Sequence, residues 1–311
     1  GGGLLDHTNI VRAYDVGKVM DGNTSIYFFA MELVEGESLE ERVAREGPLP
    51  PVEAANFIRQ AAEGLAHAHC AGIVHRDIKP ANLLVDRDGV VKILDLGLAK
   101  FFGDEPQAEV PGGQPVFGTV DFLSPEQALN SHTADARSDI YSLGCSFYFL
   151  LAGHAPFPEG TLTQRLVCHL SQQPVPISQK RADVPADLEA LLQRMLAKKP
   201  ADRIQTADEL GEQLRQWLVR HADRQWIRKN PAVMAGAGAS IDGAQFPLAP
   251  GSSLPLGGDG RSGSSTETPF EAFEPDRSTV TRSIIFRRKS TPWWQFLKRM
   301  WQDRGRKRRR R

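Results

Sequence analysis

Hydrophobic positions in the first 221 residues change period along the chain, which predicts a β-rich start followed by a mainly helical body. Two runs rich in β-branched and aromatic residues, 10–19 and 25–34, flank the turn residues Asp21-Gly22-Asn23, as is typical of a β-hairpin. Short apolar runs at 82–85 and 91–94 predict a second, smaller hairpin. The pattern therefore indicates an α+β fold.

The other elements repeat apolar residues with the helical period. A short polar helix is expected at 38–46. A long helix is expected at 51–70, with prolines near its start and Gly72 just beyond its end. Five more helices are predicted, at 124–129, 139–151, 162–170, 185–196 and 207–219. Two of their starts carry a capping-box pattern, Ser124 with Gln127 and Thr206 with Glu209.

Composition excludes several classes of protein. The chain has 311 residues and is 41% hydrophobic, which is enough for a core and excludes a wholly disordered chain. No apolar stretch reaches the roughly 18 residues of a membrane-spanning helix. Three cysteines indicate a reducing compartment, and we expect a cytoplasmic protein. The chain opens on Gly1-Gly2-Gly3 without Met or a readable signal peptide, so we expect a fragment of a longer product.

The net charge of zero hides two oppositely charged regions. Residues 282–311 carry a net charge of +12, and the rest of the chain carries −12. Residues 231–281 are about 41% Gly, Pro and Ser, which is typical of disordered segments. The composition therefore predicts a globular part up to 221, a flexible linker at 222–282 and a basic, Trp-containing tail at 283–311.

The strongest chemical signal is His75-Arg76-Asp77-Ile78-Lys79-Pro80-Ala81-Asn82, which lies between the long helix and the second hairpin. Four further motifs follow in order: Asp95-Leu96-Gly97, Gly118-Thr119 with Ser124-Pro125-Glu126, Asp139-Ile140-Tyr141-Ser142-Leu143-Gly144, and Arg203. Each motif alone is weak evidence. Together, with the predicted elements between them, they resemble the bacterial-type Ser/Thr protein kinases.

The resemblance covers residues 1–221 and implies a two-lobed kinase-like fold. Residues 1–36 would form part of a β-rich N-lobe and the hinge, and 37–221 a mainly helical C-lobe. The resemblance implies ATP and Mg²⁺ as cofactors, protein substrates with Ser or Thr acceptors, and a role in signalling.

The resemblance also implies roles for individual residues. Asp77 would accept or orient the proton of the substrate hydroxyl, and Lys79 would reach the transferring phosphate. Asn82 and Asp95 offer the oxygen ligands that Mg²⁺ prefers, with Asp95 also on the nucleotide side. In the hinge, Met31 would be the gatekeeper, and the backbone groups of Glu32 and Val34 would bond adenine. Leu84 would form the floor of the pocket.

The sequence departs from the family pattern in several places. Leu96 replaces the usual Phe, and Ser124 replaces the usual Ala before Pro125-Glu126. Glu126 is expected to pair with Arg203. No Gly-rich phosphate loop, strand Lys or helix Glu precedes these motifs in the given chain. We therefore hypothesise that residues 1–311 alone transfer phosphate poorly.

The segment from Leu98 to Gly118 contains no Ser, Thr or Tyr, although Arg76 in this family normally binds a phosphate on that loop. One interpretation is that acidic residues of the loop (Asp104, Glu105 and Glu109) replace the phosphate. The alternative is an ordinary solvated acidic loop.

Several other residues allow either a functional or a structural interpretation. His67, His69 and Cys70 suggest a metal site, but residues one and two apart on a helix do not face one another, so packing or surface roles are favoured. Cys145 is expected to be a buried small hydrophobe, and His75 a packing residue that organises the catalytic loop.

The tail leaves three alternatives. Its apolar residues fall near one helical face, with basic residues off it, which suits an anionic membrane surface or an acidic partner. These apolar residues are Trp293, Trp294, Leu297, Met300 and Trp301. Nucleic acid is a weaker candidate, and a solvated tail is the third. The alternative function for the whole chain is a non-catalytic pseudokinase or scaffold that uses this tail for binding.

Overall fold

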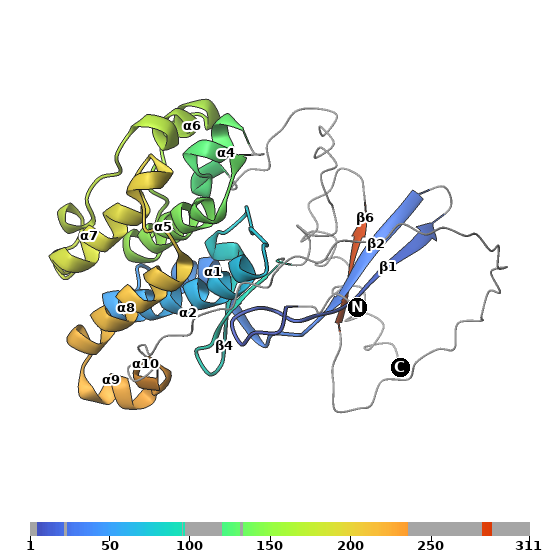
Figure 1. Ribbon diagram of the computed structural model, residues 1–311, viewed down its shortest axis with the longest axis horizontal. Coiled ribbons are helices and arrows are strands. Elements are labelled where there is room, and N and C mark those ends of the chain that lie inside the picture. Colours follow the sequence, from blue (N-terminus) through green and yellow to red (C-terminus); the bar gives the residue numbers. More distant parts are fainter. Residues whose placement is uncertain are drawn as a thin grey trace, which may run out of the picture.

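The computed structural model describes residues 5–21, 24–94, 96, 120–130, 133–235 and 282–287, with the backbone alone for 15–21, 24–30, 235 and 282–287. A sheet of long antiparallel strands lies at one side, and a body of helices lies at the other (Figure 1). This arrangement confirms the α+β expectation.

The larger sheet has the strand order β1-β2-β6. Strands β1 (Ala13–Asp21) and β2 (Thr24–Met31) form the predicted hairpin. Strand β6 (Arg282–Arg287) comes from far along the chain and pairs antiparallel with β2, with Arg282 opposite Met31. The boundary between the predicted linker and tail thus falls on a strand.

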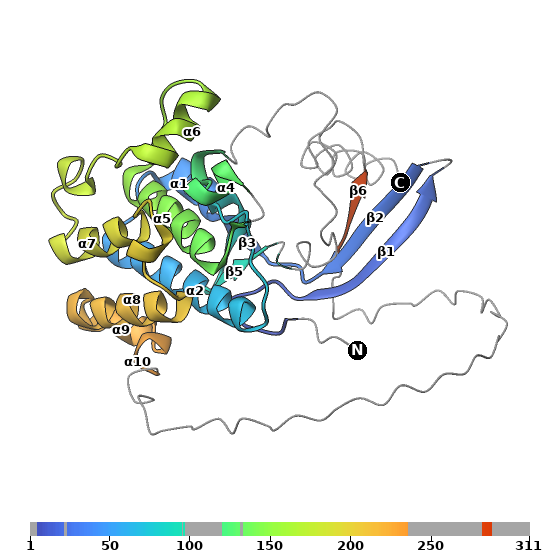
Figure 2. The ribbon, with the colours of Figure 1, turned by 45° about the horizontal axis from the view of Figure 1, so that its top comes forward.

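A second sheet, β3-β4-β5, joins the chain start to the helical body. Its strands are β3 (Gly36–Ser38), β4 (Leu83–Asp86) and β5 (Val91–Ile93). The Val11 backbone N–H donates to the Ile93 carbonyl, and the Ile93 N–H donates to the Asn9 carbonyl, both at 2.9 Å. Figure 2 shows β3 and β5 beside α2, between the larger sheet and the helices.

The seven predicted helices are present with bounds close to those predicted, and two short helices that were not predicted, α9 and α10, follow them. In chain order they are α1 (Leu39–Glu46), α2 (Pro51–Cys70), α4 (Pro125–Leu129), α5 (Ala136–Ala152), α6 (Leu162–Ser171), α7 (Ala186–Met195), α8 (Ala207–His221), α9 (Arg224–Lys229) and α10 (Ala232–Ala235). Short 3₁₀ turns lie at Pro80–Asn82 (η1), Val120–Phe122 (η2), Ile177–Gln179 (η4) and Pro200–Asp202 (η5).

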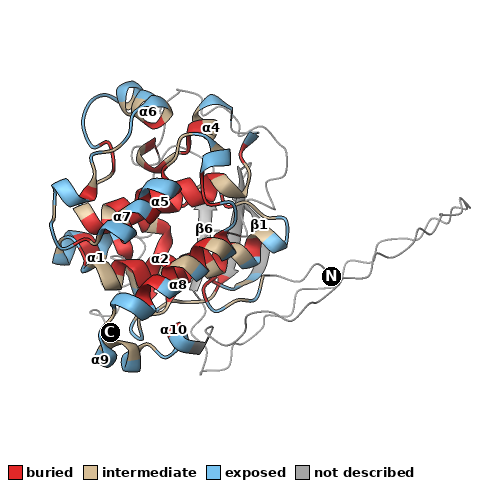
Figure 3. Cartoon of the chain, turned by 60° about the vertical axis from the view of Figure 1, so that its left-hand side comes forward, coloured by how far each residue is buried: buried red, intermediate tan, exposed pale blue. Residues whose placement is uncertain are grey.

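Helices α2 and α5 form the centre of the core. Helix α2 packs against both α5 and α8, and both α2 and α5 are buried over most of their length (Figure 3). Helix α5 is apolar nearly all round, which is the pattern of a buried helix. Several of its polar residues are buried as well, among them Ser138, Asp139 and Ser142. Buried polar groups need partners, so α5 is where the fold positions specific contacts.

Local capping explains where several helices begin. Ser124 and Gln127 form the predicted capping box at α4. At α8 the Thr206 side chain accepts from the Glu209 N–H, but the Glu209 carboxylate accepts from the Gln205 N–H instead. The capping-box prediction at Thr206 is therefore only half right.

The predicted linker begins too early. Residues 224–229 and 232–235 form α9 and α10, and the Asp223 side chain caps α9 by accepting from the Gln225 and Trp226 N–H groups, both at 2.8 Å. The first part of the range 222–282 is thus helical, because a local cap and packing of α10 on α8 outweigh composition. Residues 236–281 and 288–311 lie outside the described residues. No helix in the described part of the chain could cross a membrane.

Candidate active site

Three predicted site residues meet in the loop between α2 and β4. The Lys79 ammonium donates to Asp77 Oδ2 at 2.7 Å. The Asn82 side-chain amide donates to the same oxygen at 3.1 Å and to the Asp77 backbone carbonyl at 2.8 Å. Two donors therefore fix one carboxylate oxygen of Asp77, and Oδ1 forms no hydrogen bond with the described residues. The structure thus brings Asp77, Lys79 and Asn82 together, and their catalytic roles stay predictions.

A buried aspartate on α5 holds this loop in place. Asp139 is fully buried, and its two oxygens accept from the backbone N–H groups of His75 and Arg76, both at 2.8 Å. Oδ2 also lies 2.8 Å from His69 Nε2. These contacts support the backbone at Arg76, which has a positive φ of 66°, a conformation that non-glycine residues rarely adopt.

His75, His67 and Cys145 pack within the protein, whereas Cys70 is exposed. His75 is buried, and its Nε2 lies 2.7 Å from the Leu94 carbonyl. His67 stacks on His7, with ring centroids 5.1 Å apart. Cys145 is buried, and burial raises the pKa of its thiol. Among the described residues, no cluster of three His, Cys, Asp or Glu side chains could hold a metal ion.

Asp95, the second predicted metal ligand, lies outside the described residues. The residue before it is firmly placed, because the Leu94 N–H donates to the Asn82 carbonyl at 2.9 Å. Asn82 suits a magnesium ligand: its side-chain nitrogen is used on Asp77, and its amide oxygen forms no hydrogen bond with the described residues. Leu96 is buried, as expected for an apolar residue in the usual Phe position.

The predicted hinge residues connect the two sheets. Met31 is buried at the end of β2, while Glu32 and Val34 are half-buried. The Glu32 N–H donates to the Arg12 carbonyl at 2.9 Å, and its carboxylate pairs with Lys92 of β5 at 2.9 Å. Leu84 lies on β4 opposite Lys92. The predicted adenine contacts of Glu32, Val34 and Leu84 stay predictions.

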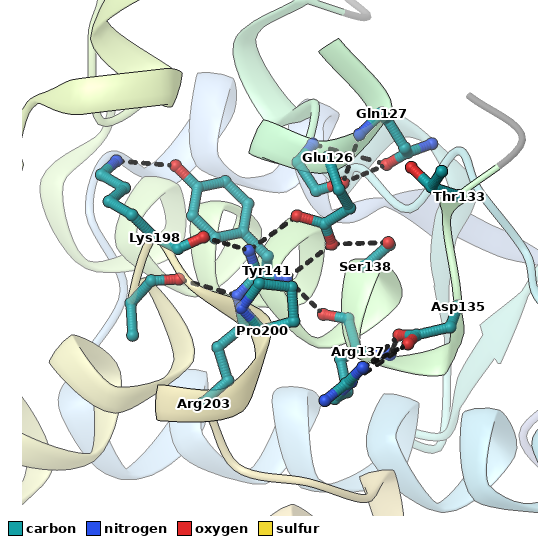
Figure 4. A network of polar contacts seen from close by, with 12 residues as sticks. Glu126, Gln127, Thr133, Asp135, Arg137, Ser138, Tyr141, Lys198, Pro200 and Arg203 are labelled. Carbon is teal, nitrogen blue, oxygen red and sulfur yellow. Dashed lines mark hydrogen bonds and ion pairs between the residues drawn. The ribbon is translucent and has the colours of Figure 1, made fainter. Parts of the chain in front are cut away.

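Helix α4 makes one contact that the sequence did not predict and one that it did. The Gln127 side chain donates to the Arg76 carbonyl at 2.8 Å, so the start of α4 is attached to the catalytic loop. Glu126 accepts from Arg203 at 2.6 and 2.8 Å and from the Ser138 hydroxyl at 2.6 Å (Figure 4). Burial would raise the pKa of Glu126, but the hydrogen bonds from Arg203 and Ser138 outweigh it and lower that pKa. The predicted Glu126–Arg203 pair is confirmed.

Sequence reasoning did not predict the contacts that Asp139 and Gln127 make with the catalytic loop. The available signal for Asp139 was an acidic residue inside an otherwise apolar helix pattern, where an unpaired charge would be costly. Gln127 was recognised only as a capping residue, and its contact with Arg76 crosses 51 residues of sequence.

Comparison with known proteins agrees with this geometry. The family model described as protein kinase domain matches residues 3–214. This chain belongs to the protein kinase domain family. The kinase domain sequence is 40% identical over 210 residues to serine/threonine-protein kinase PknB of Mycolicibacterium smegmatis, covering 68% of this chain and 33% of that protein.

Other relatives give the same picture. The probable serine/threonine-protein kinase PknB of Corynebacterium glutamicum is 40% identical over 216 residues, again covering 68% of this chain and 33% of that protein. This kinase chain thus spans about a third of the length of the curated relatives it matches. Among solved structures, Rad53 1-466 in complex with AMP-PNP is similar, with a TM-score of 0.55 and 27% identity over 69% of this chain and 52% of that one.

Proposed function

We propose that the protein transfers the γ-phosphate of ATP to serine or threonine hydroxyls of protein substrates, with Mg²⁺, and acts in signalling. The observation that carries this proposal is the arrangement of Asp77, Lys79 and Asn82 on one carboxylate oxygen. The names of the relatives support the Ser/Thr class, and the AMP-PNP complex of Rad53 supports ATP as the donor.

The chemistry follows from how Asp77 is held. Lys79 and Asn82 occupy Oδ2, so Oδ1 remains to accept a proton from an incoming hydroxyl. Lys79 brings a positive charge beside the position where the phosphate would transfer. When bound, Mg²⁺ would neutralise negative charge on the phosphates, and Asn82 and Asp95 are the residues that would hold it. The buried Asp139 keeps the loop backbone fixed, so little reorganisation is needed during the reaction.

The test is a phosphate-transfer assay on the longest gene product that contains this chain. We expect transfer from γ-labelled ATP to a protein substrate such as dephosphorylated casein, with label on Ser and Thr. Asp77→Asn should lower the rate by about 10²–10⁴-fold, because the proton acceptor is lost. The matched control is Asp88→Asn on the exposed β4–β5 turn, which should leave the rate unchanged.

The same assay decides between the proposal and a non-catalytic scaffold. A scaffold would bind nucleotide or partners without transfer, and Asp77→Asn would then change nothing. Residues 1–311 alone should show little transfer, since they carry no Gly-rich loop and no strand Lys paired with a helix Glu. Full turnover from residues 1–311 would contradict that expectation, though not the kinase proposal.

We further propose that the tail at 283–311 contacts an anionic membrane surface. The sequence supports this proposal, because residues 282–311 carry a net charge of +12 and include three tryptophans among the basic residues. A peptide covering this segment should bind vesicles that contain phosphatidylserine and be released by high salt. Equal binding to neutral vesicles would contradict the proposal.

A further inference from the structure

Lys198 is a half-buried lysine in the C-terminal helical body. It lies in the turn between α7 and η5, and its ammonium donates to the Tyr141 hydroxyl at 3.0 Å (Figure 4). The same nitrogen lies 4.9 Å from the ring centroid of Phe157 and 5.3 Å from that of Tyr141. Within the described part of the chain, Lys198 forms no ion pair with a carboxylate.

A second cation shares this site. The guanidinium of Arg203 lies 4.9 Å from the Tyr141 ring centroid, and its own charge is balanced by Glu126. Burial, with a further contribution from Arg203, lowers the pKa of Lys198 to about 8. Some of the molecules therefore carry a neutral amine here near neutral pH.

A buried histidine fixes the hydroxyl that holds this amine. Tyr141 Oη lies 3.0 Å from Nδ1 of His169, which is fully buried. Burial lowers the pKa of His169 to about 3, so the ring is neutral, and the hydroxyl can donate to Nδ1. The oxygen of Tyr141 then accepts from Lys198. A neutral amine keeps this contact with one N–H and has its lone pair free to react.

We propose that Lys198 is a nucleophilic lysine and a site of acylation by small acyl phosphates. The amine nitrogen attacks the carbonyl carbon, the bond from that carbon to the phosphate oxygen breaks, and phosphate leaves with the proton lost from nitrogen. The product is an amide at Nζ, and no oxidant or reductant is needed. The exposed Lys199 beside it adds positive charge that favours approach of the anionic reagent.

Acylation here would act on more than one side chain. The backbone carbonyls of Ala197 and Lys198 accept from Arg203 at 2.7 and 2.9 Å, so the turn that carries Lys198 also positions the Arg203–Glu126 pair. An amide at Nζ removes the charge between two rings and needs additional room there. Because Glu126 lies on α4, the modification would also affect the position of this helix. Gln127 of the same helix contacts the catalytic loop.

The experiment uses residues 1–311 and acetyl phosphate at limiting concentration, with acetylation measured by mass spectrometry on a peptide that contains both Lys198 and Lys199. We expect the folded protein to be acetylated at Lys198 at least about ten times faster than at Lys199 near neutral pH. The rate at Lys198 should rise through about pH 8, where half of the amines are neutral, and level off about two pH units higher.

Two controls separate the effect of the fold from that of the local sequence. In concentrated urea the two lysines should react at similar rates, because the burial that lowers the pKa of Lys198 is lost. Lys199→Arg should leave the rate at Lys198 unchanged, and Lys198→Arg should abolish the signal at that position. The proposal is overturned if Lys198 reacts no faster than Lys199 in the folded protein, or if the preference persists in urea. Neither outcome depends on kinase activity.

Discussion

The guanidinium of Arg203 donates to both carboxylate oxygens of Glu126, at 2.6 and 2.8 Å, across 77 residues of sequence. The Arg203 side chain is 0% exposed, and that of Glu126 is 13% exposed. The remaining donors of Arg203 are used as well, on the carbonyls of Arg137, Ala197 and Lys198. A fully satisfied buried cation of this kind fastens α4 to the C-terminal helices.

Removing one partner of this pair should be costly. We expect Arg203→Ala to lower the free energy of unfolding by about 3–5 kcal/mol, because it leaves the Glu126 carboxylate buried and unpaired. The matched control is Arg194→Ala, which breaks the exposed pair with Glu209 and should cost about 0–1 kcal/mol. Urea unfolding of both variants measures the difference, and equal losses would contradict the assignment.

Stability should also depend on pH through His169. Burial lowers the pKa of His169 from 6.5 to about 3, so between these values the unfolded chain binds a proton that the folded chain does not. The free energy of unfolding should therefore fall as pH decreases below 6.5. His169→Gln should remove up to about 1.4 kcal/mol per pH unit from this slope. Urea unfolding at several values between about pH 5 and 7 measures how the free energy of unfolding changes with pH. The same slope in the parent protein and in His169→Gln would contradict a neutral, buried imidazole ring.

Two glycines inside helices should respond in opposite directions to the same substitution. A Cβ at Gly64 of α2 would lie 2.8 Å from the Asn9 carbonyl oxygen and 2.9 Å from Ile93 Cδ1, whereas one at Gly211 of α8 would meet nothing closer than 3.7 Å. Gly64→Ala should destabilise by about 1–3 kcal/mol, because the chain start must shift. Gly211→Ala should stabilise by about 0.5–1 kcal/mol. Thermal unfolding measures both changes, and stabilisation by both substitutions would show that the Asn9 carbonyl can move away at little cost.

Local patterns predicted the elements well. Helix α2 has the predicted bounds, 51–70, because prolines near its start and Gly72 after its end are signals within the same stretch of chain. Gly72 has a φ of 73°, which suits the end of a helix. Helix α9 was missed although Asp223 is a cap, because the surrounding Gly, Pro and Ser content dominated the reading.

The site was predictable only in part. Asp77, Lys79 and Asn82 are close in sequence, and their meeting follows from a short loop. The support from Asp139 crosses more than 60 residues, and the Lys92–Glu32 pair joins two different sheets. Such contacts depend on how α2, α5 and the sheets pack, and no single stretch of sequence specifies that packing.

The side chain of Arg76 is exposed, and its backbone is held in an unusual conformation by Asp139 and Gln127. The position of Arg76 therefore does not depend on a bound phosphate. Residues 98–118 offer no Ser, Thr or Tyr to phosphorylate. We therefore expect phosphatase treatment of the longest gene product to leave its transfer rate within about twofold, because the positioning of the catalytic loop depends on buried contacts rather than on an added charge. The rate is measured before and after treatment, with loss of phosphate verified by mass spectrometry. A tenfold or larger drop that is restored by incubation with ATP would show that a phosphate elsewhere in the protein supplies the partner of Arg76.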